Sequence, residues 1–240
     1  MTPDDVLDSL FPAGHDVRKE AGLLFGSAAL PSGGKVLVIG VADRTPVGVD
    51  EAIRLSGHVL AAMNEEPSPI LVIVDSDSQR MAKRDEMLGL NEFLSHLAKC
   101  LIFADLSGRP TIGILYGHSA AGAFLATALA TRVLVGLPSA DPVVMDLPSM
   151  SRVTKLPVEV LQEKAKSTPV FAPGLANLAQ TGAVHMTWDV ATPLSDQLEA
   201  LLAAMPDNVD RRGALGKERG GRPKAMDVAE RVRTLALQGL

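Results

Sequence analysis

Four short stretches of the chain are apolar at nearly every position, and they predict the strands of a central sheet. They are residues 35–42, 70–74, 111–115 and 133–136, which are rich in Val, Ile and Leu. A strand with one buried face would alternate between apolar and polar residues, and these runs do not alternate. We therefore expect a parallel or mixed sheet that is covered by helices on both faces.

Between these runs the apolar residues recur at the spacing of helices. Asp50 is the expected N-cap of the first of these helices. A period of 3.6 residues predicts one long helix over about 90–107, although 100–104 by itself looks like a strand. An Ala-rich helix is expected over 120–131, with Ser119 as its N-cap. Strands that alternate with helices predict an α/β chain with right-handed crossovers.

The segments on either side of this pattern differ from it in composition. Glycines and prolines interrupt any period in residues 1–34, which we interpret as an N-terminal arm before a single domain at 35–206. In the remaining segment, 207–240, residues 211–224 hold six basic residues and one acidic residue. They predict a basic, solvated linker, and an amphipathic helix is expected after it, over about 225–237.

Composition and charge exclude several classes of function. Hydrophobic residues make up 47% of the 240 positions but aromatic residues only 3%, so the chain can bury a core yet lacks a stacking surface for single-stranded nucleic acid. The net charge of −5 argues against duplex nucleic acid as a partner. With one cysteine, no visible signal peptide and no apolar run of membrane-spanning length, we expect a cytoplasmic protein without a membrane partner.

The turn after the third predicted strand carries the sharpest chemical signal, and one interpretation is nucleophilic. Its Gly-His-Ser-Ala-Ala sequence approximates the Gly-x-Ser-x-Gly elbow of α/β-hydrolases, with Ser119 as the nucleophile and Ala121 in place of the last glycine. A triad would then need His185, the one histidine that follows Ser119, together with Asp141 or Asp146 as the acid.

A second interpretation uses the backbone of the same turn instead of a nucleophile. The N–H groups of Ala120, Ala121 and Gly122 lie at the expected start of a helix, where unpaired donors stabilise the negative charge of an enolate or a tetrahedral species. A third interpretation is purely structural, because Gly117 and Gly122 would also permit a strand and a helix to pack closely. The residues alone leave all three open.

A second candidate loop, Asp-Ser-Asp-Ser-Gln at 75–79, follows the second predicted strand. Its backbone donors are expected to face the same crevice, unless the loop is only a solvated cap of the next helix. The five histidines and Cys100 show no paired spacing, so we expect no metal site.

Three runs end predicted strands in order: Gly-Val-Ala-Asp-Arg-Thr-Pro at 40–46, Val-Asp-Ser-Asp-Ser-Gln at 74–79 and Tyr-Gly-His-Ser-Ala-Ala-Gly at 116–122. Together they resemble the carboxyltransferase branch of the crotonase-like enzymes. Within that branch, the stretch 34–196 resembles the gamma subunit of malonate decarboxylase. The resemblance implies a crotonase-like, carboxyltransferase-type ββα superhelix within the α/β class.

The resemblance also implies partners and a reaction. The family subunit pairs with a beta subunit of the same fold, and the active site lies at their interface. The substrate is a malonyl thioester on an acyl carrier protein subunit, carried by a prosthetic group derived from dephospho-CoA, and no cofactor binds the chain directly. Loss of CO₂ leaves an enolate that is then protonated to the acetyl thioester.

The resemblance assigns roles to two sets of residues. In the turn, Ala121 and Gly122 provide backbone donors, and the side chains of His118 and Ser119 are candidates for a proton donor or a hydrogen bond. The residues expected to bind substrate come from both loops and are Ser78, Gln79, Gly117 and Ala120. Which set holds the thioester and which holds the carboxylate is left open.

Two further expectations concern the ligands of such an enzyme. The turn of the branch usually has more glycines, whereas this chain has Ser119, Ala120 and Ala121, whose methyl and hydroxymethyl groups narrow the approach of a bulky biotin ring. This favours a biotin-independent enzyme. The basic run 211–224 is a candidate surface for an acidic carrier protein or for phosphates of its prosthetic arm.

Overall fold

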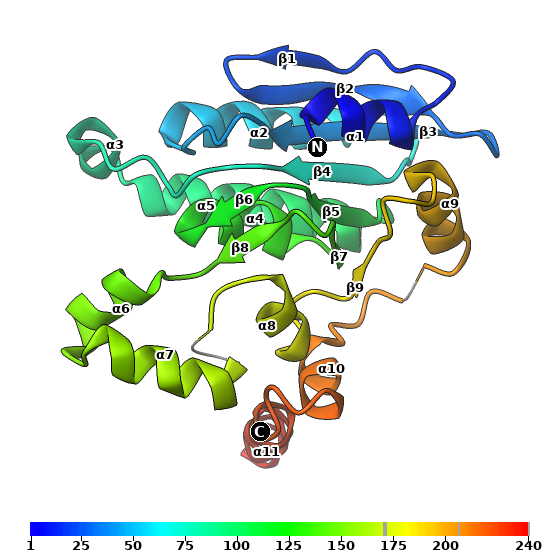
Figure 1. Cartoon of the computed structure of the whole chain (residues 1–240). Helices are drawn as coiled ribbons and strands as arrows, with labels where there is room; N and C mark the ends of the chain where they lie inside the picture. The colour runs from blue at the N-terminus through cyan, green and yellow to red at the C-terminus, as the bar shows by residue number, and fades with distance from the viewer. Residues whose placement is uncertain (170–171, 206, 240) are drawn as a thin grey trace.

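The computed structural model describes residues 1–169, 172–205 and 207–239 and has a seven-stranded sheet at its centre (Figure 1). Its strand order is β1-β2-β3-β4-β5-β7-β9. The middle of the sheet consists of four parallel strands: β3 (Lys35–Val41), β4 (Ile70–Val74), β5 (Thr111–Leu115) and β7 (Val133–Gly136). These are the four strands that the apolar runs predict, so that prediction is confirmed.

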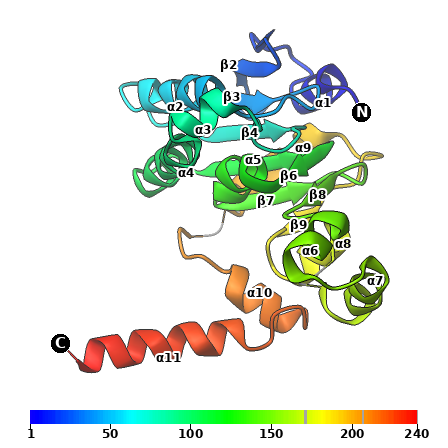
Figure 2. The same cartoon turned by 90° about the vertical axis from the view of Figure 1, so that its left-hand side faces the viewer.

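Both faces of these strands are buried, which explains why their sequences do not alternate. Ile39 and Val72 join one hydrophobic core, whereas their neighbours Val38 and Leu71 join a second core on the opposite face. Figure 2 shows helices on both sides of the sheet. The helices that cover the first core are α2 (Val49–Ala62) and α4 (Leu90–Leu106), and those that cover the second are α1 (Pro3–Leu10) and α9 (Leu194–Ala203). The long helix predicted over 90–107 is therefore confirmed.

The N-terminal segment is part of the sheet and not an irregular arm. It forms α1, β1 (Arg18–Glu20) and β2 (Leu23–Ala29), and β2 pairs along its whole length with β3 in antiparallel register. The buried side chains of Val6 and Phe11 fix α1 against the second core. The strand β2 is not evident from the sequence because Gly26 interrupts its apolar run. Glycine is required at this position, since a Cβ would collide with the backbone of Val17. The division at residues 34 and 206 stays a prediction.

The predicted cap of α2 is wrong, because Gly48 is the N-cap and the helix begins at Val49, two residues earlier than an N-cap at Asp50 requires. The Val49 N–H donates to Oδ1 of Asp85 at 2.8 Å, and this buried carboxylate comes from the short helix α3 (Lys83–Met87). Asp50 instead forms an ion pair with Arg84, with 2.7 Å between Oδ2 and Nη1.

The Ala-rich helix predicted over 120–131 is shorter than expected. Residues 118–120 form the short strand β6 (His118–Ala120), and the helix α5 (Ala121–Ala126) follows, with a separate 3₁₀ turn, η1 (Ala128–Ala130). Thr127 ends α5, with φ −107° and ψ −94°, and its hydroxyl donates to the carbonyl oxygen of Ala123. Ser119 therefore lies in a strand and does not cap the helix.

The second half of the chain adds mostly helices below the sheet in Figure 1. Its elements are β8 (Asp141–Val143), α6 (Leu147–Thr154), α7 (Val158–Ser167), α8 (Leu175–Gln180), β9 (Met186–Thr187), α10 (Arg212–Glu218) and α11 (Ala225–Gln238). β8 pairs in parallel with β6 as a separate two-stranded sheet. The last helix agrees with its prediction, and Figure 2 shows it projecting from the body of the molecule. None of the helices in the described residues is long and apolar enough to cross a membrane.

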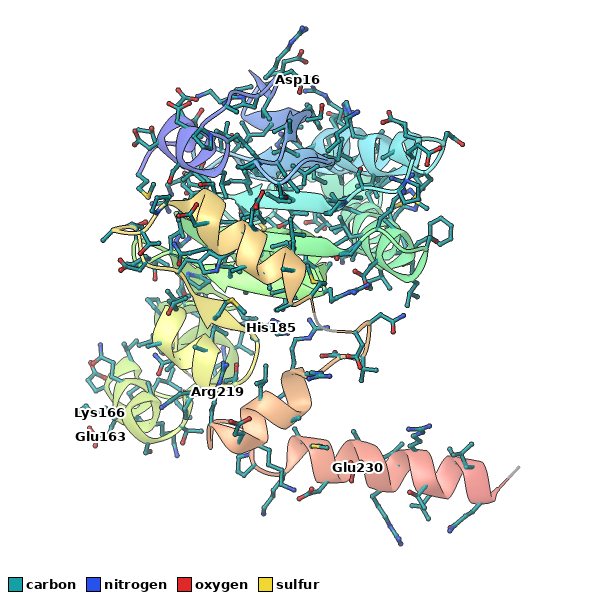
Figure 3. The ribbon with its side chains drawn as sticks, turned by 90° about the vertical axis from the view of Figure 1, so that its right-hand side faces the viewer. Asp16, Glu163, Lys166, His185, Arg219 and Glu230 are labelled. Carbon is teal, nitrogen blue, oxygen red and sulfur yellow. The ribbon has the colours of Figure 1, made fainter. Side chains whose placement is uncertain are left out.

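The basic segment 211–224 is not a solvated linker, because α10 packs against the end of α8. Arg219 donates to the carbonyl oxygens of Ala179 and Val184, each at 2.8 Å, and to that of His185 at 2.7 Å. Figure 3 shows His185 and Arg219 in this part of the molecule. Three other cations of the segment pair with carboxylates outside it: Arg211 with Asp207, Arg212 with Asp210 and Lys217 with Asp227. The surplus of positive charge is therefore largely neutralised within the chain.

We predict that Gly216→Ala weakens the attachment of the tail, whereas Gly213→Ala does not. A Cβ at position 216 would collide with the Thr181 carbonyl oxygen, while at position 213 the nearest atom is 3.8 Å away. The first change should lower the free energy of unfolding by about 1–3 kcal/mol. The second should be neutral or stabilise α10 by up to about 1 kcal/mol through helix propensity. Urea denaturation measures both, and equal effects would contradict the packing of α10 on Thr181.

Candidate active site

Three loops meet at the carboxyl ends of β3, β4 and β5, and the carboxylate of Asp75 holds them together. Its Oδ1 accepts a hydrogen bond from the His118 N–H at 2.9 Å, and its Oδ2 accepts one from the Arg44 N–H at 3.2 Å. A Cβ on Gly117 would collide with this carboxylate, so only glycine fits there. The sequence prediction placed Asp75 in the candidate loop but gave it no role.

Backbone strain is concentrated at the same edge of the sheet. Asp43, Arg44 and Ala121 have φ values of +57°, +52° and +47°, a region that residues other than glycine seldom occupy. Ala121 is the first residue of α5, so its N–H has no acceptor inside the helix. Strained residues of this kind persist where the surrounding structure fixes them, and they cluster at functional sites.

The structure brings the two predicted sets of donors together at one hydrogen bond. The Gly122 N–H donates to Oε1 of Gln79 at 2.9 Å. The side-chain amide oxygen of Gln79 thus accepts the hydrogen bond of Gly122, one of the two backbone donors that the sequence prediction assigned to an oxyanion. Gln79 reaches this position because its loop pairs with the preceding one, through the bridge between Val47 and Gln79.

Ser78 is used within its own loop. Its N–H donates to Oδ1 of Asp77 at 2.9 Å, and its hydroxyl donates to the Gln79 carbonyl oxygen at 3.1 Å. Of the predicted second set, Gln79 therefore contacts the turn directly, whereas the hydrogen bonds of Ser78 shape the loop that carries Gln79.

A groove between α4 and α5 opens beside Gly122. It is lined mainly by small and apolar side chains, with Asn91 and Ser95 as the polar exceptions. Its lining residues are Asn91, Leu94, Ser95, Ala98, Gly122, Leu125 and Ala126. The groove therefore offers an apolar surface next to a backbone donor.

The serine-hydrolase interpretation does not fit this geometry. Ser119 is completely buried, and its hydroxyl donates to the carbonyl oxygen of His118 at 2.7 Å. His185 Nδ1 accepts the Leu134 N–H at 3.1 Å, and Asp146 caps α6. The proposed nucleophile, base and second candidate acid therefore make separate structural contacts.

His118 and Asp141 form a pair that the sequence prediction did not recognise. The Nδ1 of His118 lies 3.3 Å from Oδ2 of Asp141, and the two residues are register partners in β6 and β8. The sequence prediction missed this pair because it did not include the short strand β8, which has only three residues, begins at Asp141 and contains Pro142. Among the described residues, no group of three His, Cys, Asp or Glu side chains is placed to hold a metal ion.

The fold defines the class of the protein first. The structure matches one chain of transcarboxylase 12S with a TM-score of 0.68 at 15% identity, covering 84% of this chain and 39% of that one. It also matches a chain of a Pseudomonas malonate decarboxylase hetero-tetramer in complex with coenzyme A, with a TM-score of 0.77 at 26% identity over 98% of both chains. The chain therefore has the crotonase-like, carboxyltransferase-type fold that its motifs predict.

Sequence comparison gives the particular family. The sequence model of the malonate decarboxylase gamma subunit family matches residues 42–236. The malonyl-S-ACP:biotin-protein carboxyltransferase of Malonomonas rubra is 32% identical over 196 residues, which cover 73% of this chain and 67% of that protein. The chain belongs to the malonate decarboxylase gamma subunit family, and the predicted resemblance is confirmed.

We predict that Asp75→Ala disorders the candidate site while Asp77→Ala, two residues away, does not. The first change removes the acceptor that two strand-end loops share, and it leaves their N–H groups unpaired. We expect a loss of about 1–3 kcal/mol in the free energy of unfolding, mainly from the half-buried His118 N–H, because the Arg44 N–H is exposed to water. Asp77 is exposed and accepts a hydrogen bond from its neighbour Ser78, so its loss should cost less than about 1 kcal/mol. Chemical denaturation separates the two outcomes.

A pH-dependent contribution to stability is expected from His185. Burial, followed by the charges of Arg212 and Arg219, lowers its pKa from 6.5 to about 4. The unfolded chain therefore binds a proton that the folded chain excludes between about pH 6.5 and pH 4, so stability falls as the pH falls through this window, by about 3 kcal/mol. His185→Asn keeps an acceptor for Leu134 but cannot titrate, and its stability should fall less over the same window. Parallel pH profiles for the two proteins would contradict this.

Proposed function

We propose that this chain is the gamma subunit of a biotin-independent malonate decarboxylase. With a beta subunit of the same fold it would convert a malonyl thioester on an acyl carrier protein to the acetyl thioester and CO₂. Membership of the gamma subunit family supports the reaction. The strained turn at Ala121, with its backbone donors beside an apolar groove, is the structural observation that supports the mechanism.

Decarboxylation requires groups that stabilise the negative charge developing on the substrate, and it does not require a nucleophile. As the bond between the carboxylate carbon and C2 breaks, its electron pair moves into the thioester and places negative charge on the carbonyl oxygen. Fixed backbone donors stabilise this enolate more than they stabilise the neutral thioester, and that difference lowers the barrier. In the proposed site, Ala121 and Gly122 supply these donors, and Gly117 and Ala120 leave room for the substrate.

The Gln79 amide supports this use of the turn. Its Oε1 lies 2.9 Å from the Gly122 nitrogen, a distance suited to the carbonyl oxygen of a thioester. In the proposal the substrate oxygen displaces Gln79 from Gly122, and the freed amide, on the loop that Ser78 shapes, contacts the carboxylate end. This assigns the thioester to the turn and the carboxylate to the loop.

The two kinds of relative differ in what receives the carboxyl group. The Malonomonas rubra protein is a carboxyltransferase that acts on a biotin protein, whereas the solved Pseudomonas structures are malonate decarboxylases that form hetero-dimers and hetero-tetramers. The Ala121 methyl group, fixed at a positive φ in the turn, crowds the approach to the backbone and favours release of CO₂ over transfer to a biotin ring. Activity that avidin abolishes would instead support the carboxyltransferase function.

The partners follow from the same proposal. The malonyl group would arrive on a prosthetic group derived from dephospho-CoA, attached to an acyl carrier protein subunit in the cytoplasm. The basic run 211–224 is a weaker carrier-binding surface than its composition indicates, since Arg211, Arg212 and Lys217 already pair with carboxylates. Attraction of an acidic carrier by this run would depend mainly on the exposed Arg222 and Lys224.

We predict that Ala121→Val and Gly122→Pro abolish turnover, whereas Ala121→Gly retains it. Valine is bulky and strained at φ +47°, and proline removes the Gly122 N–H, while glycine keeps the donor and relieves the strain. Loss of one donor should lower kcat by about 10²–10³-fold.

The measurement is CO₂ release from malonyl-carrier by the purified complex of co-expressed subunits. Co-purification of each variant with its partner is the control for assembly. Near-normal turnover by Gly122→Pro in an intact complex would refute the proposed oxyanion site.

A further inference from the structure

An enolate needs a proton at C2 after CO₂ has left, and His118 provides the imidazole of the run 116–122. Its main chain is fixed on both sides. The His118 N–H donates to Asp75, and its carbonyl oxygen accepts the Ser76 N–H at 2.7 Å and the Ser119 hydroxyl at 2.7 Å. The ring therefore projects from a backbone that leaves it little freedom of position.

Asp141 is fixed opposite this ring by a separate set of hydrogen bonds. Its N–H donates to the Gly117 carbonyl oxygen at 3.0 Å, and β8 runs parallel to β6 with His118 and Asp141 in register. The pairing of the two strands thus places the two side chains next to each other, with 3.3 Å between Nδ1 and Oδ2.

The two side chains differ in exposure. The His118 side chain is 19% exposed and that of Asp141 is 68% exposed. A pair with one largely exposed partner contributes little to stability even when both groups are charged, so it is poorly explained as a contact that holds the fold. A carboxylate on Nδ1 has a clearer chemical consequence, because it fixes the tautomer and leaves Nε2 as the nitrogen that can exchange a proton.

We propose that Asp141 is a positioning residue that holds His118 with its proton-donating Nε2 toward the enolate. This inference rests on the proposed function. A proton passes from Nε2 of the imidazolium to C2 of the enolate. The electron pair of the carbon–carbon double bond forms the C2–H bond, and an electron pair on the enolate oxygen re-forms the carbonyl double bond of the acetyl thioester. His118 is left neutral with its Nδ1–H on Asp141, and solvent reprotonates Nε2. Asp141 keeps its negative charge throughout.

The charged groups around the ring are consistent with this role. Asp141 faces it from β8, and Asp75, in the loop after β4, binds the His118 main chain. The helix α5, which follows β6, carries no titratable residue. Asp141 is therefore the carboxylate placed to accept a hydrogen bond from the ring, whereas Asp75 fixes the main chain that carries it.

The first test reads the tautomer directly and does not depend on activity. The complex is prepared with ¹⁵N-labelled histidine, and the His118 signal is assigned by its loss in His118→Gln. In the wild-type protein we expect a proton on Nδ1, and in Asp141→Ala a shift of the neutral ring toward the Nε2–H form. An unchanged tautomer in Asp141→Ala would overturn the proposal.

The second test is a double-mutant cycle on CO₂ release and acetyl-carrier formation. His118→Gln should lower kcat by about 10²-fold or more, and Asp141→Asn by about tenfold or more, each with KM changed less than about twofold. In the His118→Gln background, Asp141→Asn should cost nothing further, because its effect passes through the histidine. Additive losses would show that Asp141 only supports β8, and would overturn the proposal.

Matched variants keep the outcome separate from folding and from the proposed function. Asp141→Glu retains the carboxylate and should recover most of the activity that Asp141→Asn loses. Asp146→Asn changes an acid of the same segment that caps α6, a role asparagine also fills, and should leave kcat unchanged. A wild-type complex that releases no CO₂ would refute the proposed function, whereas an active wild type with a fully active His118→Gln variant would refute this inference alone.

Discussion

The geometry of the candidate site depends on one carboxylate. Asp75 follows a fully buried strand, and it binds the main chain of the neighbouring loop on each side, at Arg44 and at His118. Parallel strands end at the same edge of a sheet, but nothing in their hydrogen bonding fixes the loops that leave them. A single acceptor with two oxygens solves this problem, and it requires glycine at 117 to make room. The strained backbone at Asp43, Arg44 and Ala121 is held at the edge where this carboxylate acts.

The central sheet was predictable because its cause is local. A strand covered on both faces is apolar at nearly every position, so the strands β3, β4, β5 and β7 can be recognised from their own sequences. β2 was missed for the opposite reason. It is held by pairing with β3, a contact between residues that the sequence places apart, and its Gly26 breaks the pattern that a local window detects.

The candidate site was predictable at the level of loops but not at the level of atoms. Residues 75–79 and 116–122 follow adjacent parallel strands, so their proximity followed from topology. No pattern indicates that Gln79 places its oxygen on Gly122, or that Ala121 takes a positive φ at the first position of α5. The sequence prediction did select Asp141 as a candidate acid for orienting a histidine, but linked it with His185. Only the pairing of β6 with β8 places it beside His118.

The difference between local pattern and long-range contact also explains why the prediction for the basic segment 211–224 was wrong. Six basic residues in fourteen predict a solvated cationic segment, since composition counts charges without their partners. In the structure Arg219 is bound to three carbonyl oxygens at the end of α8 and the start of β9, and these acceptors belong to residues more than thirty positions away. A guanidinium suits this task because its donors form a planar fork that can reach several carbonyls at once. Part of the positive charge in the tail therefore holds α10 against α8, and it is not free to attract a partner at long range.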